Sequence, residues 1–130
     1  VQIILKNKIK KKIICFLGVT FKANTDDMRE SSCLKMIPFL IKKGAHINYF
    51  DPSGKKKILQ KIKNVNYLSS IKEACLNADL VIIHTEWNEF KSINFKNLVK
   101  KKNFSIYDMR NIYSYKKMKR DNIKYFCIGR

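Results

Sequence analysis

The sequence has few residues that break regular structure and no long hydrophobic run. It contains only 4 Gly and 2 Pro among 130 residues, which excludes collagen-like and Pro/Gly-rich low-complexity chains. The longest apolar run, residues 13–19, is too short to form a membrane-spanning helix, so we expect no membrane partner. Hydrophobic residues nevertheless make up 45% of the chain, a fraction typical of one folded domain rather than a disordered chain.

Acidic residues are scarce, and arginine is scarce among the basic ones. Lys and Arg total 28 against 10 Asp and Glu, which gives a formal net charge of +18. This charge favours a polyanionic partner such as nucleic acid. However, only four of the cations are Arg, the residue best suited to bidentate phosphate and base recognition. Because Ile and Asn are abundant as well, the pattern of an AT-rich genome, we interpret much of the lysine as solvated surface and expect no nucleic-acid partner.

The cysteines lie far apart in the sequence and form no CxxC motif. Their positions are Cys15, Cys33, Cys75 and Cys127. Most of them fall inside apolar patterns, where a thiol behaves as a small buried hydrophobic group. Because His46 and His84 are the only histidines, we expect no metal site. The pattern predicts reduced core thiols and therefore a cytoplasmic protein.

Short apolar strands alternate with amphipathic helical segments along the chain. Strands are expected at residues 13–19, 45–50, 65–68, 80–83, 105–107 and 125–128. Helices are expected at residues 34–43, 55–63, 70–77, 95–102 and 113–120. Asp27 or Ser31 is a candidate cap for the first helix, and Ser70 with Glu73 forms a candidate capping box for the third. The alternation predicts an α/β domain with an open, mainly parallel sheet and helices on both faces.

Basic side chains follow two of the expected strands at the point where each strand ends. Lys22 comes shortly after the first strand, and Arg110 follows the strand expected at residues 105–107. Arg29 lies in the polar loop before the first helix. In an open parallel sheet, ligands bind beyond the carboxyl ends of the strands. Cations at this edge fit a phosphate-bearing ligand. The alternative is that they are simply solvated loop residues.

Several features of a complete nucleotide-dependent enzyme are missing. The sequence has no GxGxxG motif, and Gly18 after the first strand is solitary. Asp51 ends the second strand as a ribose-binding acid does, but Pro52 beside it favours a turn. No Ser or Cys lies next to a His in the sequence pattern of a catalytic triad. The residues alone therefore predict a phosphate-ligand domain without catalytic machinery.

Five segments carry a more specific signal. They are LGVTFKANTDDMRES (residues 17–31), YFDP (49–52), ADLVIIHTEW (78–87), DMRNIY (108–113) and IGR (128–130). In this order they resemble the C-terminal domain of the nucleotide-sugar dehydrogenases, the family of UDP-glucose and GDP-mannose dehydrogenases. The resemblance implies a Rossmann-like fold for residues 12–130. It also implies that residues 1–11 are the end of a central helix or a linker.

The family oxidises the C6 hydroxyl of a nucleotide sugar to a carboxylate and reduces two NAD per turnover. Its nucleophilic Cys lies in a central domain and its NAD glycine loop in an N-terminal domain, and neither segment is in this sequence. The resemblance implies part of an enzyme, with NAD bound mainly elsewhere and with a UDP-sugar and the rest of a dehydrogenase chain as partners. We expect none of the four Cys to be catalytic, the chain alone to be inactive, the full-length protein to be a homodimer and this part to be monomeric.

The resemblance also assigns roles to individual residues. The predicted substrate-binding residues are Phe21, Lys22 and Arg110. The predicted contact with NAD is Arg29. Lys22 would act as a point charge on the diphosphate or sugar. The chain departs from many relatives at Ala23, where Pro is frequent, and at Met109, where Gly is frequent, and neither change removes a charged contact.

The identity of the nucleotide sugar is the finest of these predictions. The segments Thr85-Glu86-Trp87 and Arg110-Asn111-Ile112-Tyr113 look most like the bacterial branch of the family that acts on UDP-glucose. Relatives acting on GDP-mannose or on UDP-N-acetyl sugars remain an alternative, as does a stand-alone, non-catalytic binding module. Trp87 either stacks on a ligand or anchors its loop against the fold, and the anchor is the favoured interpretation.

Overall fold

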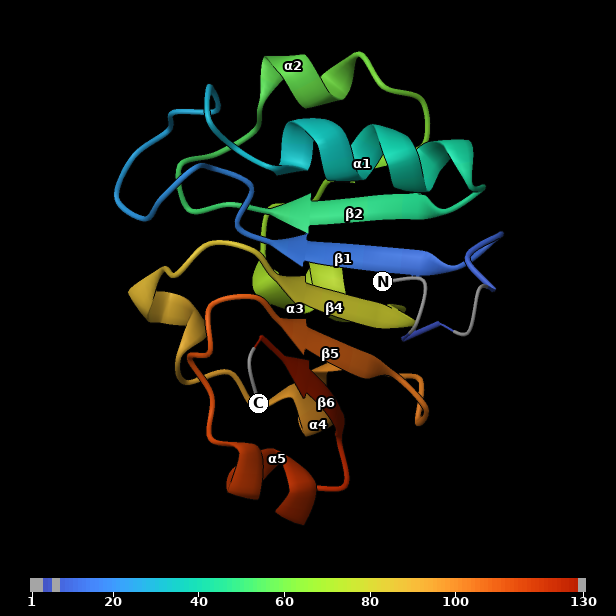
Figure 1. Ribbon diagram of the computed structural model, residues 1–130, viewed down its shortest axis with the longest axis vertical. Helices are drawn as coiled ribbons and strands as arrows, with labels where there is room; N and C mark the ends of the chain where they lie inside the picture. The colour runs from blue at the N-terminus through green and yellow to red at the C-terminus, as the bar shows by residue number, and fades with distance from the viewer. Residues whose placement is uncertain (1–3, 6–7, 129–130) are drawn as a thin grey trace.

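The computed structural model describes residues 4–5 and 8–128. These residues form one sheet of six strands in the order β3-β2-β1-β4-β5-β6 (Figure 1). The strands are β1 (Ile13–Leu17), β2 (His46–Phe50), β3 (Val65–Tyr67), β4 (Leu80–Ile83), β5 (Ser105–Asp108) and β6 (Lys124–Cys127). Every pair of neighbours runs parallel, so the sheet is wholly parallel where the sequence predicted a mainly parallel one.

Helices cover both faces of the sheet, as the sequence predicted. They are α1 (Cys33–Lys42), α2 (Lys57–Gln60), α3 (Ile71–Cys75), the 3₁₀ helix η1 (Asn88–Phe90), α4 (Phe95–Leu98) and α5 (Tyr115–Arg120). Figure 1 shows α1 and α2 beside the β1-β2-β3 half of the sheet. Behind the sheet, α3 lies at β1 and β4, and α4 lies at β6. The expected open Rossmann-like architecture is therefore confirmed.

Two hydrophobic clusters form the core, one on each face of the sheet. On one face, Ile37 of α1 packs with Phe16 and Ile82 in a single cluster of buried side chains. On the other face, Cys75 of α3 and Phe95 of α4 belong to a second cluster with the alternate residues of the same strands. Because the strands are buried on both faces, their sequences are nearly continuous apolar runs.

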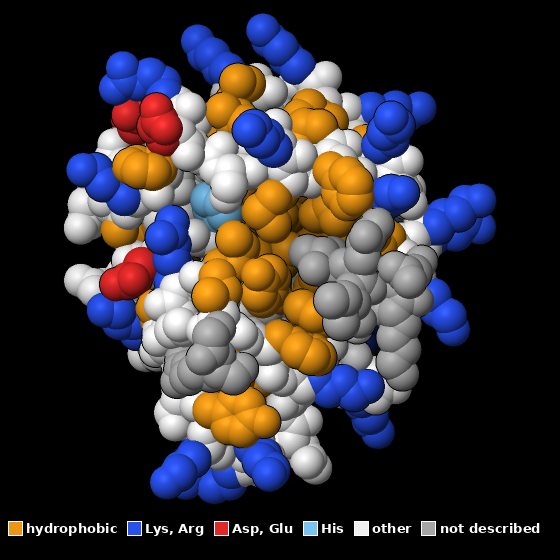
Figure 2. All heavy atoms as spheres, viewed as in Figure 1, with side chains coloured by type: hydrophobic (Ala, Val, Ile, Leu, Met, Phe, Trp, Pro, Cys, Tyr) orange, Lys and Arg blue, Asp and Glu red, His pale blue; other side chains and the backbone are white. Residues whose placement is uncertain are grey.

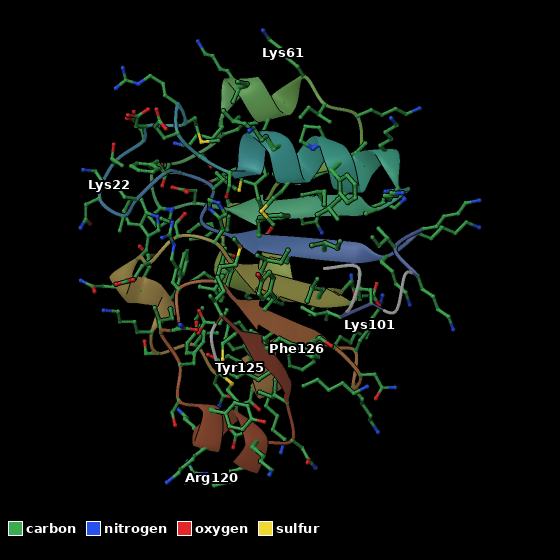
Figure 3. The ribbon with its side chains drawn as sticks, viewed as in Figure 1. Lys22, Lys61, Lys101, Arg120, Tyr125 and Phe126 are labelled. Carbon is green, nitrogen blue, oxygen red and sulfur yellow. The ribbon has the colours of Figure 1, made fainter. Side chains whose placement is uncertain are left out.

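One part of the sheet presents apolar side chains without a covering helix among the described residues. Tyr107 and Met109 are half-buried and pack against the cluster that contains α1. Phe126 of β6 is 40% exposed and lies on the viewed face in Figure 3. Figure 2 shows hydrophobic side chains gathered in the middle of this view, with Lys and Arg mainly around the rim. On this face the Lys and Arg side chains therefore lie mainly at the periphery, and the centre is apolar.

Helix ends are where structure and sequence interpretation differ most. The residue that precedes α1 is Ser32, whose side chain forms no cap hydrogen bond, whereas the hydroxyl of the predicted Ser31 accepts the N–H of Cys33 at 3.2 Å. The helix expected at 55–63 contains only four residues, because the chain turns through Asn64 at a φ of 67° to enter β3. The capping box of α3 is confirmed, since the Ser70 hydroxyl accepts the Glu73 N–H at 3.1 Å. Gly44 follows α1 at a φ of 95°, the left-handed conformation that ends many helices.

Parts of two predictions lie outside the described residues. These are positions 1–3 and 6–7 of the upstream segment 1–11, and positions 129–130 of the last motif. Within the described part of that segment, Ile9 is buried in the cluster that contains α1. The assignment of the segment to a central helix or linker stays a prediction. Among the described helices, none is both long and apolar enough to cross a membrane.

Candidate functional site

The strand order reverses direction between β1 and β4, at the centre of the sheet. The chain leaves β1 toward α1 on one face, and it leaves β4 toward η1 and α4 on the other. The two strands are in register, with Leu17 opposite Ile83 at their carboxyl ends. An open parallel sheet has its ligand crevice at this switch point. The residues that follow β1, β4 and β5 therefore form the candidate site.

Gly18 fixes how closely the ends of β1 and β4 approach. Its N–H donates to the carbonyl of Phe50 at 2.8 Å, and its φ is 81°. A Cβ at this position would lie 2.5 Å from the Cβ of Thr85. Only glycine combines this backbone angle with this contact. The solitary glycine thus packs two strand ends together.

Asp51 belongs to the frame of the site. Its side chain is fully buried and accepts the N–H of Val19 at 2.8 Å. Its other carboxylate oxygen accepts the N–H of Ser53 at 2.9 Å. The turn interpretation of Asp51-Pro52 is therefore confirmed. The carboxylate ties the end of β2 to the loop after β1 and is not directed at a ribose.

Arg110 bridges two of the segments that surround the switch point. Its Nε donates to the carbonyl of His84 at 2.8 Å, and its Nη2 donates to the carbonyl of Phe21 at 3.2 Å. Arg110 is nevertheless exposed. A guanidinium has five N–H donors, so donors remain for a ligand after these two bonds. The bridge fixes a positive charge between the end of β4 and the loop after β1.

Lys22 lies on the loop held by this bridge. The loop is closed on itself, because the N–H of Phe21 donates to the carbonyl of Asp27 at 3.1 Å. The hydroxyl of Thr20 donates to the Lys22 carbonyl at 3.0 Å. The Lys22 side chain is exposed and reaches out beyond the carboxyl ends of the strands (Figure 3). Among the described residues it forms no ion pair, so its ammonium is available to an anionic ligand.

Arg29 lies on the same loop but is already paired. Its Nε and Nη2 donate to the two carboxylate oxygens of Asp27, at 3.1 and 3.0 Å. These bonds lower the pKa of Asp27 to about 2. The Arg29 side chain is 88% exposed and faces solvent. The structure therefore brings Arg110 and the Phe21-Lys22 segment together, whereas the partner of Arg29 is Asp27 on its own loop.

A chain of hydrogen bonds runs beneath the loop. The Thr85 hydroxyl donates to the carbonyl of Thr20 at 2.9 Å. His84 joins this hydroxyl through Nδ1 at 3.1 Å and joins the Ser32 hydroxyl through Nε2 at 2.7 Å. Burial, followed by the charge of Arg110, lowers the pKa of His84 to about 4. The imidazole is therefore neutral at physiological pH and ties both ends of the loop to β4.

Asp108 organises the third segment of the site. It is fully buried at the end of β5, and its Oδ2 accepts the N–H of Ile112 at 2.9 Å and the hydroxyl of Tyr125 at 2.6 Å. Its Oδ1 accepts the N–H of Arg110 at 3.0 Å. A charged acceptor with several donors is a strong local constraint. Asp108 thereby fixes the backbone from which Arg110 projects.

Trp87 follows β4 and packs inward. It is half-buried against the cluster that contains α3 and α4. Its indole Nε1 is buried without a hydrogen-bond partner among the described residues. These contacts agree with the favoured interpretation, in which Trp87 anchors its loop.

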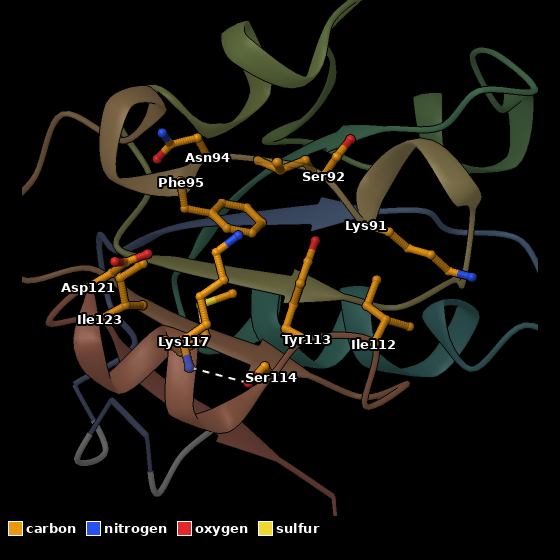
Figure 4. Close-up of a pocket in the computed structure, with 12 residues that line it drawn as sticks. Lys91, Ser92, Asn94, Phe95, Ile112, Tyr113, Ser114, Lys117, Asp121 and Ile123 are labelled. Carbon is orange, nitrogen blue, oxygen red and sulfur yellow. Dashed lines mark hydrogen bonds between the residues drawn. The ribbon is translucent and has the colours of Figure 1, made fainter.

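A separate hollow of about 190 Å³ lies between the η1–α4 segment and α5 (Figure 4). Phe95 and Tyr113 line it, together with Lys91 and Lys117. The Tyr113 hydroxyl donates to the carbonyl of Phe90, so that polar atom is used within the fold. None of the predicted site residues lines this hollow. The carboxyl edge at β1 and β4 is therefore the better candidate.

The arrangement is suited to binding an anion and not to nucleophilic chemistry by a thiol. Cys15, Cys33 and Cys75 are buried, and burial raises the pKa of Cys15 well above its usual value. The sequence interpretation missed the Ser32–His84 pair because its members are 52 positions apart. It also missed the use of Arg110 on two carbonyls. The one sequence signal for these contacts is that Ser32, His84 and Arg110 all lie at the ends of expected strands or helices.

The fold and the site define a Rossmann-like α/β domain with a cationic ligand edge at its switch point. The sequence of residues 15–115 matches the UDP binding domain of the UDP-glucose/GDP-mannose dehydrogenase family. The chain belongs to this family.

Individual relatives give the same result. The chain is 36% identical over 129 residues to a UDP-glucose 6-dehydrogenase of Rickettsia felis, which covers 97% of this chain and 29% of that protein. It is 36% identical to a UDP-glucose 6-dehydrogenase of Rhizobium meliloti over 94% of this chain and 28% of that protein. Among solved structures, a UDP-D-ManNAc dehydrogenase from Pyrococcus horikoshii has a TM-score of 0.77 and 26% identity, covering 98% of this chain and 28% of that one. The chain thus spans less than a third of the length of these relatives.

Proposed function

We propose that the chain is the sugar-nucleotide-binding part of an NAD-dependent UDP-glucose 6-dehydrogenase. The reaction of the whole protein would convert UDP-glucose to UDP-glucuronate with reduction of two NAD. The observation that carries the proposal is the bridge from Arg110 to the carbonyls of His84 and Phe21. This bridge places a fixed guanidinium next to the segment that presents Lys22. Arg110 and Lys22 are thus two cations at one edge of a domain whose family model is described as UDP binding.

In this proposal three residues contact the substrate. Arg110 and Lys22 bind the diphosphate or sugar side of UDP-glucose, Arg110 through its remaining N–H donors and Lys22 as a mobile point charge. Phe21 is 45% exposed beside them and lines the cleft with its ring or backbone. Desolvation of these cations by the substrate would strengthen each contact.

The described residues at the end of β1 do not form an NAD cradle. The pyrophosphate of a dinucleotide requires close backbone approach over small residues, and at the end of β1 the space next to Gly18 is filled by Thr85. Arg29 fits a supporting contact, because it is exposed and the Asp27 carboxylate occupies only its Nε and Nη2. We therefore assign NAD binding mainly to another part of the dehydrogenase, with Arg29 reaching toward it.

The rest of the dehydrogenase supplies what this part lacks. The nucleophilic Cys lies outside the chain, in agreement with the burial of Cys15, Cys33 and Cys75. We propose that the 130 residues produce no NADH by themselves, that the whole protein is a cytoplasmic homodimer, and that this part is monomeric. Sedimentation of the chain would test the last point, and a dimer would contradict it.

Calorimetric titration tests the proposed function directly. We expect UDP-glucose to bind the chain, and Lys22→Ala and Arg110→Ala to weaken binding about tenfold each. Lys61→Ala and Arg120→Ala are matched controls, because both side chains are exposed and lie away from the carboxyl edge in Figure 3. Equal losses in the controls would show a general charge effect and contradict the proposed site.

GDP-mannose is the second titrant, since relatives in this family differ in their nucleotide sugar. We expect weaker binding of GDP-mannose than of UDP-glucose. Tighter binding of GDP-mannose would identify it as the substrate in place of UDP-glucose and would leave the proposed site unchanged. Absence of binding by both would contradict the proposed function.

A further inference from the structure

With the imidazole of His84 neutral, the hydrogen-bond chain beneath the loop has one possible polarity. A backbone carbonyl only accepts, so the single hydroxyl proton of Thr85 is used on the carbonyl of Thr20. The Thr85 oxygen therefore faces His84 Nδ1 as an acceptor, at 3.1 Å. His84 must carry its proton on Nδ1. Its Nε2 is then an acceptor.

This polarity fixes the proton of Ser32. The Ser32 oxygen lies 2.7 Å from His84 Nε2, a distance at which two acceptors would repel each other. Ser32 therefore donates its proton to His84 and not to Met36 Sδ, which lies 3.8 Å from the same oxygen. Its hydroxyl does not cap α1, although it occupies the N-cap position. What Ser32 offers to solvent is an oxygen with lone pairs and no proton.

Ser32 is exposed, whereas the His84 side of the pair is buried at 2% exposure. Arg110 donates to the carbonyl of the same His84. The two groups that could touch a ligand therefore flank one residue, a guanidinium that donates and a hydroxyl oxygen that accepts. An anion is attracted by the first group and repelled by the second.

We propose that Ser32 is a further substrate-binding residue, whose oxygen accepts a hydrogen bond from a hydroxyl of the bound nucleotide sugar. The inference rests on the proposed function and adds a specificity element to the same edge. The cations select the phosphates, and Ser32 selects a hydroxyl-bearing group next to them. The shared chemistry is that of a sugar hydroxyl, and it belongs to either the ribose or the hexose.

The same Ser–His polarity also occurs in nucleophilic serines. Two observations favour binding over nucleophilic attack. The partner of Nδ1 is a neutral hydroxyl where a triad has a carboxylate, and burial, followed by the charge of Arg110, disfavours a positive charge on the imidazole. The imidazole is therefore held neutral, and it is too weak a base to remove the Ser32 proton. A fluorophosphonate probe is expected not to label Ser32, and labelling would overturn the binding role.

Titrations of Ser32→Ala with three ligands test the proposal. We expect the affinity for UDP-glucose to fall about fivefold, with no change for inorganic pyrophosphate, which has no sugar hydroxyl. Ser32→Thr keeps the oxygen and is expected to retain most of the affinity. An equal fall for UDP assigns the hydroxyl to the ribose, and a fall for UDP-glucose alone assigns it to the hexose.

The remaining outcomes separate the two proposals. Unchanged UDP-glucose affinity in Ser32→Ala overturns the role of Ser32 and leaves the proposed function standing. An equal loss for pyrophosphate also overturns it, because the effect would then be on the cations. Wild-type chain that binds no nucleotide sugar overturns both. The ¹⁵N spectrum of His84 gives an independent check, since a proton on Nε2 in place of Nδ1 would contradict the polarity.

Discussion

The guanidinium of Arg110 and the backbone of His84 are joined by a hydrogen bond of 2.8 Å from Nε to the carbonyl oxygen. Through this bond a side chain of β5's carboxyl end is oriented by the end of β4. The same guanidinium reaches the Phe21 carbonyl through Nη2 at 3.2 Å. The planar fork of Arg makes both bonds at once, which an ammonium on a flexible stem does not reproduce.

Arg110→Lys is therefore not a conservative change. We expect it to weaken UDP-glucose binding about tenfold, because the charge is kept but its position is lost. The free energy of unfolding should change by less than about 1 kcal/mol, since Arg110 is exposed. Calorimetry and urea unfolding measure the two effects. Arg120→Lys is the control, and unchanged affinity in Arg110→Lys would contradict the role of the fork.

Asp108→Asn should destabilise the fold. The Oδ2 atom accepts from the N–H groups of Ile112 and Tyr113 and from the hydroxyl of Tyr125. The Oδ1 atom accepts the N–H of Arg110. An amide has only one oxygen, so its NH₂ group must face either these donors or the N–H of Arg110 in a buried site. We expect a loss of about 3 kcal/mol in urea unfolding. Asp26→Asn, at an exposed position, should change stability by less than about 0.5 kcal/mol.

Gly18→Ala and Gly54→Ala separate backbone strain from steric overlap. Both glycines have positive φ, 81° and 97°, but a Cβ on Gly18 would meet Thr85 at 2.5 Å, whereas nothing lies within 4 Å of one on Gly54. We expect Gly54→Ala to cost about 1 kcal/mol from the backbone alone. Gly18→Ala should cost about 3 kcal/mol, because the overlap is added. Equal losses in thermal unfolding would mean that Thr85 moves away without cost.

Stability should fall between pH 6.5 and pH 4 because of His84. The pKa of its imidazole is lowered from 6.5 to about 4 in the folded state, so the unfolded chain binds more protons in this window. The free energy of unfolding thus keeps the full contribution of His84 above pH 6.5. It falls by about 2 kcal/mol by pH 5. Urea unfolding at pH 7.5 and pH 5 measures the difference.

The matched variants are His84→Gln and His46→Gln, at the two histidines of the chain. His84→Gln should remove most of the change in stability between the two pH values. His46 is exposed, and its variant should keep the wild-type dependence. If His84→Gln also kept the wild-type pH dependence of stability, the buried imidazole would not be the source of that dependence.

The strands were predictable because their apolar residues are continuous in sequence. Leu80–Ile83 was placed at its observed bounds, since a buried parallel strand needs side chains of this kind on both faces. Helix lengths were less predictable, and α2 is shorter than its apolar spacing indicated. Its ends depend on the turn at Asn64, which is a matter of backbone geometry and not of hydrophobic period.

The candidate site was predictable in its cations and not in its connections. Lys22 and Arg110 follow strand ends, and parallel topology alone brings strand ends together. That Arg29 pairs with Asp27, and that Ser32 meets His84, depends on loop conformation. No period or propensity in the sequence encodes such contacts. The roles of Phe21, Lys22, Arg29 and Arg110 in binding remain predictions for the titrations above.

The central position of β1 has a consequence for the chain during its synthesis. β1 pairs with β2 on one side and with β4 on the other, but β4 leaves the ribosome after β2 and β3. A half-sheet formed before then would carry unpaired backbone groups at its inner edge beside Ile14 and Phe16, a surface prone to association with other nascent chains. Residues 1–67 contain 15 Lys and Arg against 4 Asp and Glu, and this net charge of +11 would keep such half-sheets apart by mutual repulsion. The abundant lysines would then protect the unfinished protein more than they serve the finished one.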